Sequence, residues 1–300
     1  MLFPRVAIVG VGLLGGSLAL ALRQAGAAGT VVGWFRRRPA RDEALARQLV
    51  DEATLDLVGA VAGADLVVLG TPLAQMPPLV RALAPHLPPG TLVTDVGSAK
   101  AALVAEVEPL VEAAGARFIG SHPMAGSDKS GLAHSRADLF QQALCVVTPT
   151  ARTPASTTEQ AAALWRAVGG TVIPLDPARH DVLVARASHL PHVAAAALVR
   201  QVLGPGHPPE QALLCATGFR DTTRVAGGSP EMWRDIALAN RAALGPALAG
   251  LEEELRRFRR LLDAADPAGL EQYFAEARQL RQDWAGGSPV AGSPTPTAGP

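Results

Sequence analysis

The feature that most constrains this chain is the string V-A-I-V-G-V-G-L-L-G-G-S at residues 6–17. A short apolar run ends at Gly10, and Gly12 and Gly15 complete a G-x-G-x-x-G before an uncharged helical pattern over 13–22. In that context Gly10 permits a tight turn, Gly12 lets the backbone approach a pyrophosphate, and Gly15 lets the helix pack closely on the strand. The sequence therefore predicts a strand, a turn and a helix whose free N–H groups bind a dinucleotide.

Composition narrows the class of protein further. A length of 300 residues suggests about two domains, and a formal net charge of +0 gives no electrostatic case for nucleic acid or an anionic membrane surface. Cys145 and Cys215 lie in apolar stretches without disulfide or metal spacing, which predicts buried, reduced thiols. Residues 6–22 are uncharged, but they are short and glycine-rich for a membrane span. Arg5 leads directly into the first strand without a secretory signal, so we expect a cytoplasmic protein with no membrane partner.

Strand-like and helical patterns alternate through the first half of the chain, which is typical of βαβ units and a parallel sheet. We expect an α/β Rossmann domain, doubly wound around a mainly parallel sheet, at residues 1–175. The expected strands lie at 6–9, 30–34, 65–69, 91–94, 118–119, 144–148 and 171–175, and the expected helices at 13–25, 39–48, 75–84 and 100–114.

After Asp176 the pattern changes to Ala- and Leu-rich helical stretches at 177–203, 209–225, 230–264 and 267–284. We therefore expect a second, all-helical domain at residues 176–285. Within it, the strongly charged residues 251–263 indicate either a solvated helix face with i,i+4 ion pairs or a subunit interface. Residues 286–300 are uncharged and rich in Gly, Pro, Ser and Thr, and this composition predicts a disordered tail.

The end of the second expected strand predicts which nicotinamide nucleotide is bound. An NAD site has an acid there for the ribose 2′-OH, whereas here Arg36, Arg37 and Arg38 follow the strand. Guanidinium groups suit a 2′-phosphate, so Arg36 and Arg37 predict NADP in preference to NAD. The alternative is a solvated loop in an arginine-rich chain. The other expected cofactor contacts are Leu13, Leu14, Thr71, Pro72 and Ser98.

Three loops carry most of the reactive side chains. They are D-V-G-S-A-K at 95–100, G-S-H-P-M-A-G-S-D-K-S-G at 120–131, and G-F-R-D-T-T-R at 218–224, which is followed by M-W-R-D at 232–235. Lys100 and Lys129 are the only lysines among the 27 basic residues, and both fall in these loops. Unless their placement is chance, a lysine retained against such a bias is a candidate for a role that arginine cannot fill.

These strings resemble the prephenate/arogenate dehydrogenase family of tyrosine biosynthesis. The resemblance rests on H-P-M-A-G-S-D-K-S-G, on G-F-R-D-T-T-R with M-W-R-D-I, and on S-H-L-P-H at 188–192, and it covers residues 5 to about 284. It implies a Rossmann domain and a helical dimerisation domain with the active site between them, and a homodimer formed through the helical domain. The implied reaction is the oxidative decarboxylation of a cyclohexadienol, either prephenate or arogenate.

The resemblance also implies roles for individual residues. His122 corresponds to the catalytic histidine, a group suited to accept the proton of the ring hydroxyl. Ser98 corresponds to the serine that hydrogen-bonds the same hydroxyl and His122 near the nicotinamide. Arg224 corresponds to the arginine that binds a substrate carboxylate. The other expected substrate contacts are Ser127, Asp128, Lys129, His192 and Trp233.

Alternatives stay open at this point. The S-D-K-S-G loop favours prephenate over arogenate, which carries an amino group in place of the keto group. A hydroxyacid dehydrogenase would need a lysine from the helical domain, and both lysines precede residue 130. A nucleotide sensor without activity would not need His122, Ser98 and Arg224 together. We expect His189 to pack or to form hydrogen bonds only, and no metal site. Four further histidines stand in no motif: His86, His134, His180 and His207.

Overall fold

The computed structural model describes residues 1–126 and 131–286. The chain divides into two compact units, Met1–Leu244 and the part from Gly245 onward. The first unit contains both sheets and the helices that precede the division. Ser127, Asp128 and Lys129, which the sequence predicts as substrate contacts, lie outside the described residues.

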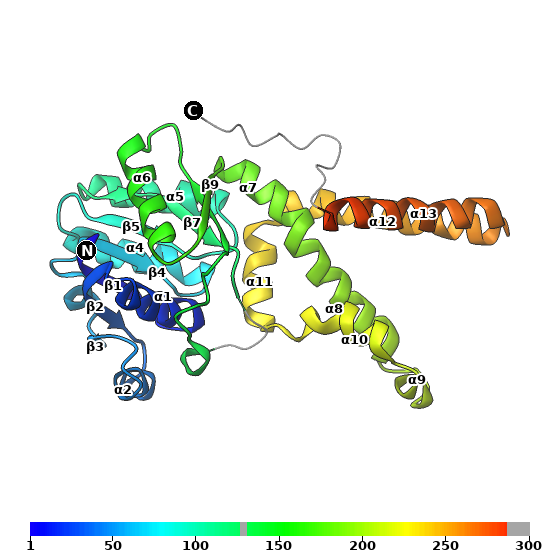
Figure 1. Ribbon diagram of the computed structural model, residues 1–300, viewed down its shortest axis with the longest axis horizontal. Coiled ribbons are helices and arrows are strands. Elements are labelled where there is room, and N and C mark those ends of the chain that lie inside the picture. Colours follow the sequence, from blue (N-terminus) through cyan, green and yellow to red (C-terminus); the bar gives the residue numbers. More distant parts are fainter. Residues whose placement is uncertain (127–130, 287–300) are drawn as a thin grey trace. The chain divides into compact units, whose positions relative to one another are not determined.

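A six-stranded sheet lies at the centre of the first unit (Figure 1). Its strand order is β3-β2-β1-β4-β5-β6, and each neighbouring pair is parallel. The order reverses between β1 and β4, the position at which doubly wound sheets bind their ligands. The predicted Rossmann fold is confirmed, although β3 was not predicted. The strands are β1 (Phe3–Val9), β2 (Ala28–Trp34), β3 (Glu52–Thr54), β4 (Leu66–Leu69), β5 (Leu92–Asp95) and β6 (Arg117–Phe118).

Both faces of this sheet are covered by helices, which explains why its central strands are continuous apolar runs. In β1, Val6 and Ile8 pack into one apolar cluster, whereas Ala7 and Val9 pack into another, because successive side chains point to opposite faces. The helices between the strands are α1 (Leu13–Gln24), α2 (Arg38–Ala46), α3 (Leu57–Val61), α4 (Met76–Leu83) and α5 (Ala101–Ala113). Of these, α3 was not predicted.

The strands after β6 form a second, three-stranded sheet instead of extending the first. It consists of β7 (Gly120–Pro123), β8 (Leu144–Thr148) and β9 (Thr171–Pro174), with α6 (Ala155–Ala167) between β8 and β9. Only Ile119 separates β6 from β7, which is too short for the crossover that a parallel neighbour needs, and β7 pairs antiparallel with β8. The segment from residue 120, expected to be a loop, therefore begins as a strand.

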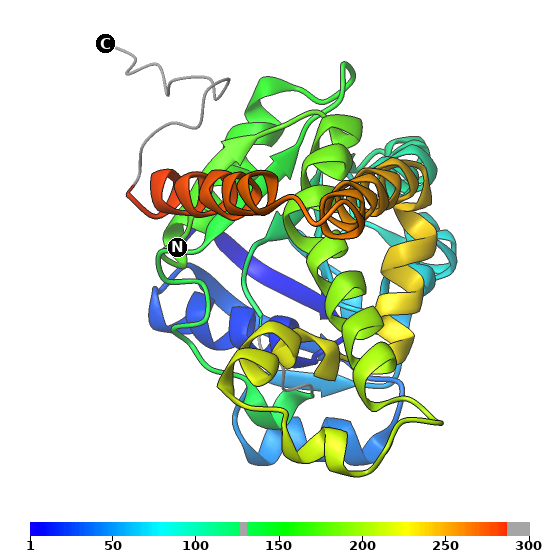
Figure 2. The ribbon, with the colours of Figure 1, turned by 90° about the vertical axis from the view of Figure 1, so that its right-hand side faces the viewer.

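Of the four predicted helical stretches that follow, two are continuous and two are broken. The stretch 177–203 is one continuous rod made of α7 (Pro177–Val184), a π-helical turn (Ala185–His189) and α8 (Leu190–Leu203) (Figures 1 and 2). The expected helix at 209–225 is instead α9 (Glu210–Leu213), α10 (Thr217–Thr223) and a 3-10 turn (Arg224–Gly227), because the backbone is extended at Ala216. The stretch 230–264 is split at Asn240 into α11 (Pro230–Ala239) and α12 (Arg241–Asp263).

The rod at Pro177–Leu203 is the one described helix that is long and apolar enough to cross a membrane by length and composition, and 22% of its apolar window is buried. It belongs to the same compact unit as the two sheets. The division into domains at 1–175 and 176–285 stays a prediction. Apart from Gly286, the tail predicted at 286–300 lies outside the described residues.

The second unit contains most of α12 and all of α13 (Pro267–Ala285). Arg257 of α12 forms an ion pair with Glu276 of α13 at 3.1 Å, and Phe258 packs against Tyr273 with ring centroids 5.4 Å apart. Along α12 the predicted i,i+4 pairing occurs between Glu252 and Arg256 at 2.9 Å. Several large apolar side chains of this unit are nevertheless exposed: Leu255, Leu262, Phe274, Leu280 and Trp284.

A buried ion pair between Asp95 and Lys100 connects the two sheets. Both side chains are fully buried. The Asp95 carboxylate, at the end of β5, also accepts hydrogen bonds from the backbone N–H of Gly97 at 2.7 Å and of Ser121 at 3.0 Å. Lys100 donates a second hydrogen bond to the Ser121 carbonyl at 2.9 Å. The loop after β5 and strand β7 are therefore held together by the contacts of Lys100 and Asp95. That arginine could not replace Lys100 here stays a prediction.

Lys100→Met should destabilise the fold strongly, because it leaves the Asp95 charge buried without its partner. We expect a loss of about 3–5 kcal/mol in the free energy of unfolding, measured by urea denaturation. The matched control is Arg81→Met, which breaks the exposed ion pair with Glu106 and should cost about 1 kcal/mol or less. Equal losses for the two variants would contradict the central role of the buried pair.

Candidate active site

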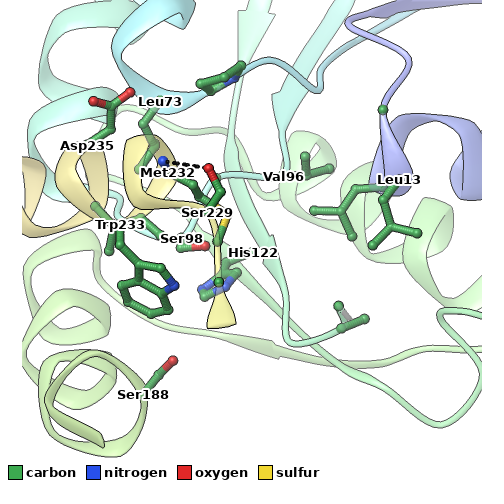
Figure 3. A pocket seen from close by; sticks show the side chains of 18 of the residues that line it. Leu13, Leu73, Val96, Ser98, His122, Ser188, Ser229, Met232, Trp233 and Asp235 are labelled. Carbon is green, nitrogen blue, oxygen red and sulfur yellow. Dashed lines mark hydrogen bonds between the residues drawn. The ribbon is translucent and has the colours of Figure 1, made fainter. Parts of the chain in front are cut away.

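A cavity of about 620 Å³ opens at the carboxyl ends of the parallel strands, beside the point where the strand order reverses (Figure 3). Its volume suits a small-molecule site. One side is formed by the loops after β1, β4 and β5 and by the end of β7. The other side is formed by the π-helical turn, α8, the turn at Arg224 and α11. The cavity thus lies between the Rossmann sheet and the first helices that follow it.

The glycine turn has the geometry that a pyrophosphate requires. Gly10 has φ of +100°, and a Cβ there would lie 2.6 Å from the Thr71 Cγ2 atom, so a side chain is excluded. A Cβ on Gly15 would collide with the Gly10 carbonyl oxygen. At Gly12, in contrast, a Cβ would meet no described atom within 4 Å, and neither a side-chain cap nor an acidic first turn occupies the N-terminus of α1. The free N–H groups of α1 therefore fit a bound dinucleotide.

The predicted cofactor residues divide into three groups. Gly10 and Gly15 shape the turn from behind the cavity. Arg36 and Arg37 lie outside it, exposed at the end of β2, and their guanidinium groups form no hydrogen bond or ion pair within residues 1–126 and 131–286. The members that line the cavity are Gly12, Leu13, Leu14, Thr71, Pro72 and Ser98.

His122 presents a neutral base to the cavity. It stands on β7 opposite Val146, is 7% exposed, and points into the cavity near Ser98 (Figure 3). Burial lowers the pKa of His122 well below its usual 6.5, and the charge of Lys100 lowers it further, as do His180 and His189. A neutral imidazole in such a place can accept a proton from a bound hydroxyl.

The opposite wall supplies groups suited to a carboxylate and a flat ring. Arg224 lines the cavity from the turn after α10, and its guanidinium makes no ion pair with any described residue. Trp233 of α11 stacks on His192 of α8 with centroids 3.8 Å apart and planes 29° apart. The His192 Nδ1–H donates to the Ser188 carbonyl at 2.9 Å, which holds the imidazole ring in that stack. Four predicted residues from four segments therefore line the cavity together with His122: Ser98, Arg224, His192 and Trp233.

The sequence did not predict three residues of the site: Ser188 and His189, which line the cavity, and His180, which contacts His122. Ser188 and His189 line the cavity from the π-helical turn, an arrangement that helical periodicity does not predict. Burial lowers the pKa of His189 to about 4, so it is neutral at physiological pH. His180, which stands in no motif, is fully buried and contacts His122. Its only sequence signal is the adjoining Asp181.

The two cysteines, both predicted to be buried, differ in their exposure. Cys145 is buried, and burial raises its pKa to about 12, as predicted for an inert thiol. Cys215 is only half-buried, and its Sγ hydrogen-bonds the Gln211 carbonyl. Among the described residues, no group of His, Cys, Asp or Glu side chains has metal-binding geometry.

Comparisons with known proteins agree with this geometry. Residues 18–174 match the family described as "Prephenate dehydrogenase, nucleotide-binding domain", and residues 176–276 match "Prephenate dehydrogenase, dimerization domain". The cyclohexadienyl dehydrogenase of Zymomonas mobilis is 34% identical over 281 residues, which are 93% of this chain and 95% of that protein.

Two solved structures extend the comparison. The prephenate dehydrogenase of A. aeolicus, in complex with hydroxyphenyl propionate and NAD+, has a TM-score of 0.87 at 32% identity, over 94% of this chain and 98% of that one. The arogenate dehydrogenase of Synechocystis has a TM-score of 0.79 at 33% identity, over 93% and 99%.

The fold and the cavity are those of a nicotinamide-dependent dehydrogenase, with a buried histidine at the site. On the strength of the two family matches and the identity with its relatives, the chain belongs to the prephenate dehydrogenase family.

The low pKa of His122 has a consequence for the pH dependence of activity. If His122 is the base, as the resemblance implies, the neutral imidazole is the active form and activity should be lost only as the pH falls through the lowered pKa. We expect kcat/KM to stay level from about pH 7.5 down to about pH 6.5 and to fall only below that. A pH series at saturating cofactor, with cofactor affinity measured at each pH as control, tests this. An acid limb centred at or above pH 6.5 would be incompatible with the geometry of the site.

Proposed function

We propose that this protein catalyses the oxidative decarboxylation of prephenate to 4-hydroxyphenylpyruvate, a step of tyrosine biosynthesis, with arogenate as the alternative substrate. One observation carries the proposal: the neutral His122 and Arg224, a cation that forms no ion pair with any described acid, line the same cavity as the glycine turn. Membership of the family supports it, since relatives named for prephenate, cyclohexadienyl and arogenate dehydrogenases cover nearly the whole chain.

The chemistry needs a proton acceptor and an aromatising ring. A bound nicotinamide nucleotide supplies the hydride acceptor. His122 takes the hydroxyl proton as the adjoining C–H bond breaks, which leaves a ring ketone. The ring carboxylate then departs as CO₂, its bonding electrons enter the ring, and the resulting phenolate takes the proton back from His122. The protein therefore gains no net proton, because His122 acts first as a general base and then returns the same proton as a general acid.

Arg224 and Trp233 orient the substrate in this scheme. The guanidinium of Arg224 suits a carboxylate through paired N–H donors. The indole of Trp233, held by His192, offers an apolar face to the ring or to the side chain. Ser98, on the loop held by Asp95 and Lys100, is a hydroxyl partner for the ring oxygen beside His122. Ser127, Asp128 and Lys129 complete the proposed substrate contacts.

The proposed cofactor is NADP in preference to NAD. Arg36 and Arg37 support this preference because both are exposed at the end of β2 and uncommitted to any described acid. A phosphate on the adenosine ribose would give these guanidinium groups charged partners. NAD is the alternative cofactor. A carboxylate that binds the ribose 2′-OH does not follow β2 here, but NAD can bind without it.

We also propose a cytoplasmic homodimer formed through the helical domain. Residues 176–276 match a dimerization-domain description, and Leu213 and Leu214 of this segment are 84% and 82% exposed. The apolar rod Pro177–Leu203 carries Ser188, His189 and His192 on its cavity side, polar groups that suit a ligand better than lipid. Contact with a second copy is the proposed explanation for its apolar exposed face.

The first test is formation of reduced nicotinamide by the purified protein, with prephenate and arogenate each offered NADP+ and NAD+. We expect turnover of prephenate, and His122→Asn should lower kcat by about 10²–10⁴-fold because Asn cannot accept the proton. Cofactor affinity of the variant should stay unchanged. Turnover of arogenate alone would establish the alternative substrate, and no turnover of either would overturn the proposed function.

The arginines can be tested separately from the chemistry. Arg36→Ala combined with Arg37→Ala should raise KM for NADP+ by roughly 10- to 100-fold per lost charged hydrogen bond and leave KM for NAD+ nearly unchanged. Arg47→Ala, which removes an exposed arginine just after α2, is the matched control. Equal changes for the two nucleotides would refute 2′-phosphate recognition.

A further inference from the structure

Behind His122 lies a chain of buried polar groups that the reaction scheme does not use. The His122 Nδ1 atom is 2.9 Å from His180 Nε2, and the His180 Nδ1 atom is 2.8 Å from Asp181 Oδ1. His180 is fully buried, and Asp181 is 4% exposed. The two imidazole planes are 71° apart, an edge-on arrangement that aims one ring nitrogen at the other.

The chain of polar groups ends at the Asp181 carboxylate, whose orientation is fixed by hydrogen bonds to both oxygens. Asp181 Oδ1 accepts the backbone N–H of Lys100 at 2.8 Å, and Oδ2 accepts that of Ala101 at 2.8 Å. Both donors lie at the N-terminus of α5, where N–H donors and the helix dipole favour a negative carboxylate. The main chain is held as well, because the Asp181 carbonyl accepts from the Asn240 side chain at 2.9 Å.

The direction of each hydrogen bond follows from that carboxylate. Asp181 can only accept, so His180 donates from Nδ1. A neutral imidazole that donates from Nδ1 carries a lone pair on Nε2, so His180 accepts at Nε2. His122 must then donate from Nδ1, which leaves its Nε2 without a proton. This hydrogen-bond relay from His122 through His180 to Asp181 therefore sets which nitrogen of His122 carries the proton.

We propose that His180 and Asp181 are positioning residues that hold His122 in the tautomer with an unprotonated Nε2 available to the substrate hydroxyl. This inference rests on the proposed function. When Nε2 takes the substrate proton, His122 becomes an imidazolium and its Nδ1–H bond to His180 becomes charge-assisted. No proton needs to leave the pair, so the proton is available to return to the product phenolate.

Asp181→Asn replaces the carboxylate, which only accepts hydrogen bonds, with an amide of nearly the same shape that also donates. If the amide NH₂ faces His180, it also opposes the backbone N–H of Lys100, the donors run the other way and His122 carries its proton on Nε2. If the amide oxygen faces His180, the NH₂ opposes the backbone N–H of Ala101. We expect kcat to fall by about 10²–10⁴-fold, as for other bases held in the wrong tautomer, with KM close to that of the parent. The thermal midpoint should fall as well, because in either orientation the amide NH₂ opposes a buried backbone N–H of α5. Asp176→Asn is the matched control, because Asp176 likewise accepts two backbone N–H groups, at the N-terminus of α7, and should leave kcat unchanged.

A second pair of variants keeps the test decisive if Asp181→Asn does not fold. His180→Gln retains an acceptor for the His122 Nδ1–H and should keep kcat within about tenfold, whereas His180→Leu fills similar space without one and should lose about 100-fold. A merely packed His180 predicts the same kcat for both, and that result would overturn the proposal.

The tautomer itself can be read without turnover. Two-bond ¹H–¹⁵N spectra of the histidine-labelled protein, with the His122 signals assigned from His122→Asn, should report an unprotonated Nε2 in the parent. In Asp181→Asn, Nε2 should become protonated in the molecules whose amide NH₂ faces His180. A protonated Nε2 in the parent would overturn the inference. Because this readout needs no substrate, it separates a failed relay from a failed assignment of the reaction.

Discussion

The buried contact between Asp95 and Lys100 is the interaction on which the site depends. It closes the end of β5, fixes the loop that carries Ser98, and attaches β7, which carries His122. A charged pair in this position is costly to desolvate, and it persists because each charge has further backbone partners. These directional hydrogen bonds fix the position of the second sheet relative to the end of β5.

Lys100 and Asp181 also join the base to the Rossmann sheet through α5. The side chain of Lys100 binds Asp95 on the sheet side, while its backbone N–H binds Asp181 on the first helix beyond the second sheet. The same residue thus reaches both the loop beside the cavity and the relay behind His122. Burial, and after it the positive charge of Lys100, lowers the pKa of His122, so Lys100 contributes both to the structure of the site and to the neutral state of the imidazole.

The predictability of each part follows from the range of the interactions that make it. Strands such as Leu66–Leu69 and the glycine turn depend on local patterns and backbone sterics, and the sequence predicted them well. The second sheet was not predicted, because the direction of β7 depends on pairing with β8 more than twenty residues later. Continuous helical patterns likewise concealed breaks at Ala216 and Asn240, which are set by backbone geometry and by buried side-chain contacts.

The sequence by itself determined the family and the dinucleotide turn, and it predicted His122 as the base, since these are carried by contiguous motifs with a local physical meaning. Only the tertiary structure decided which nitrogen of His122 meets the substrate. His180 lies 58 positions from His122 and belongs to no motif, and its role comes from a hydrogen-bond chain that ends on the N-terminus of α5. Proton placement in a buried site depends on every neighbouring donor and acceptor, and those neighbours are brought together only by folding.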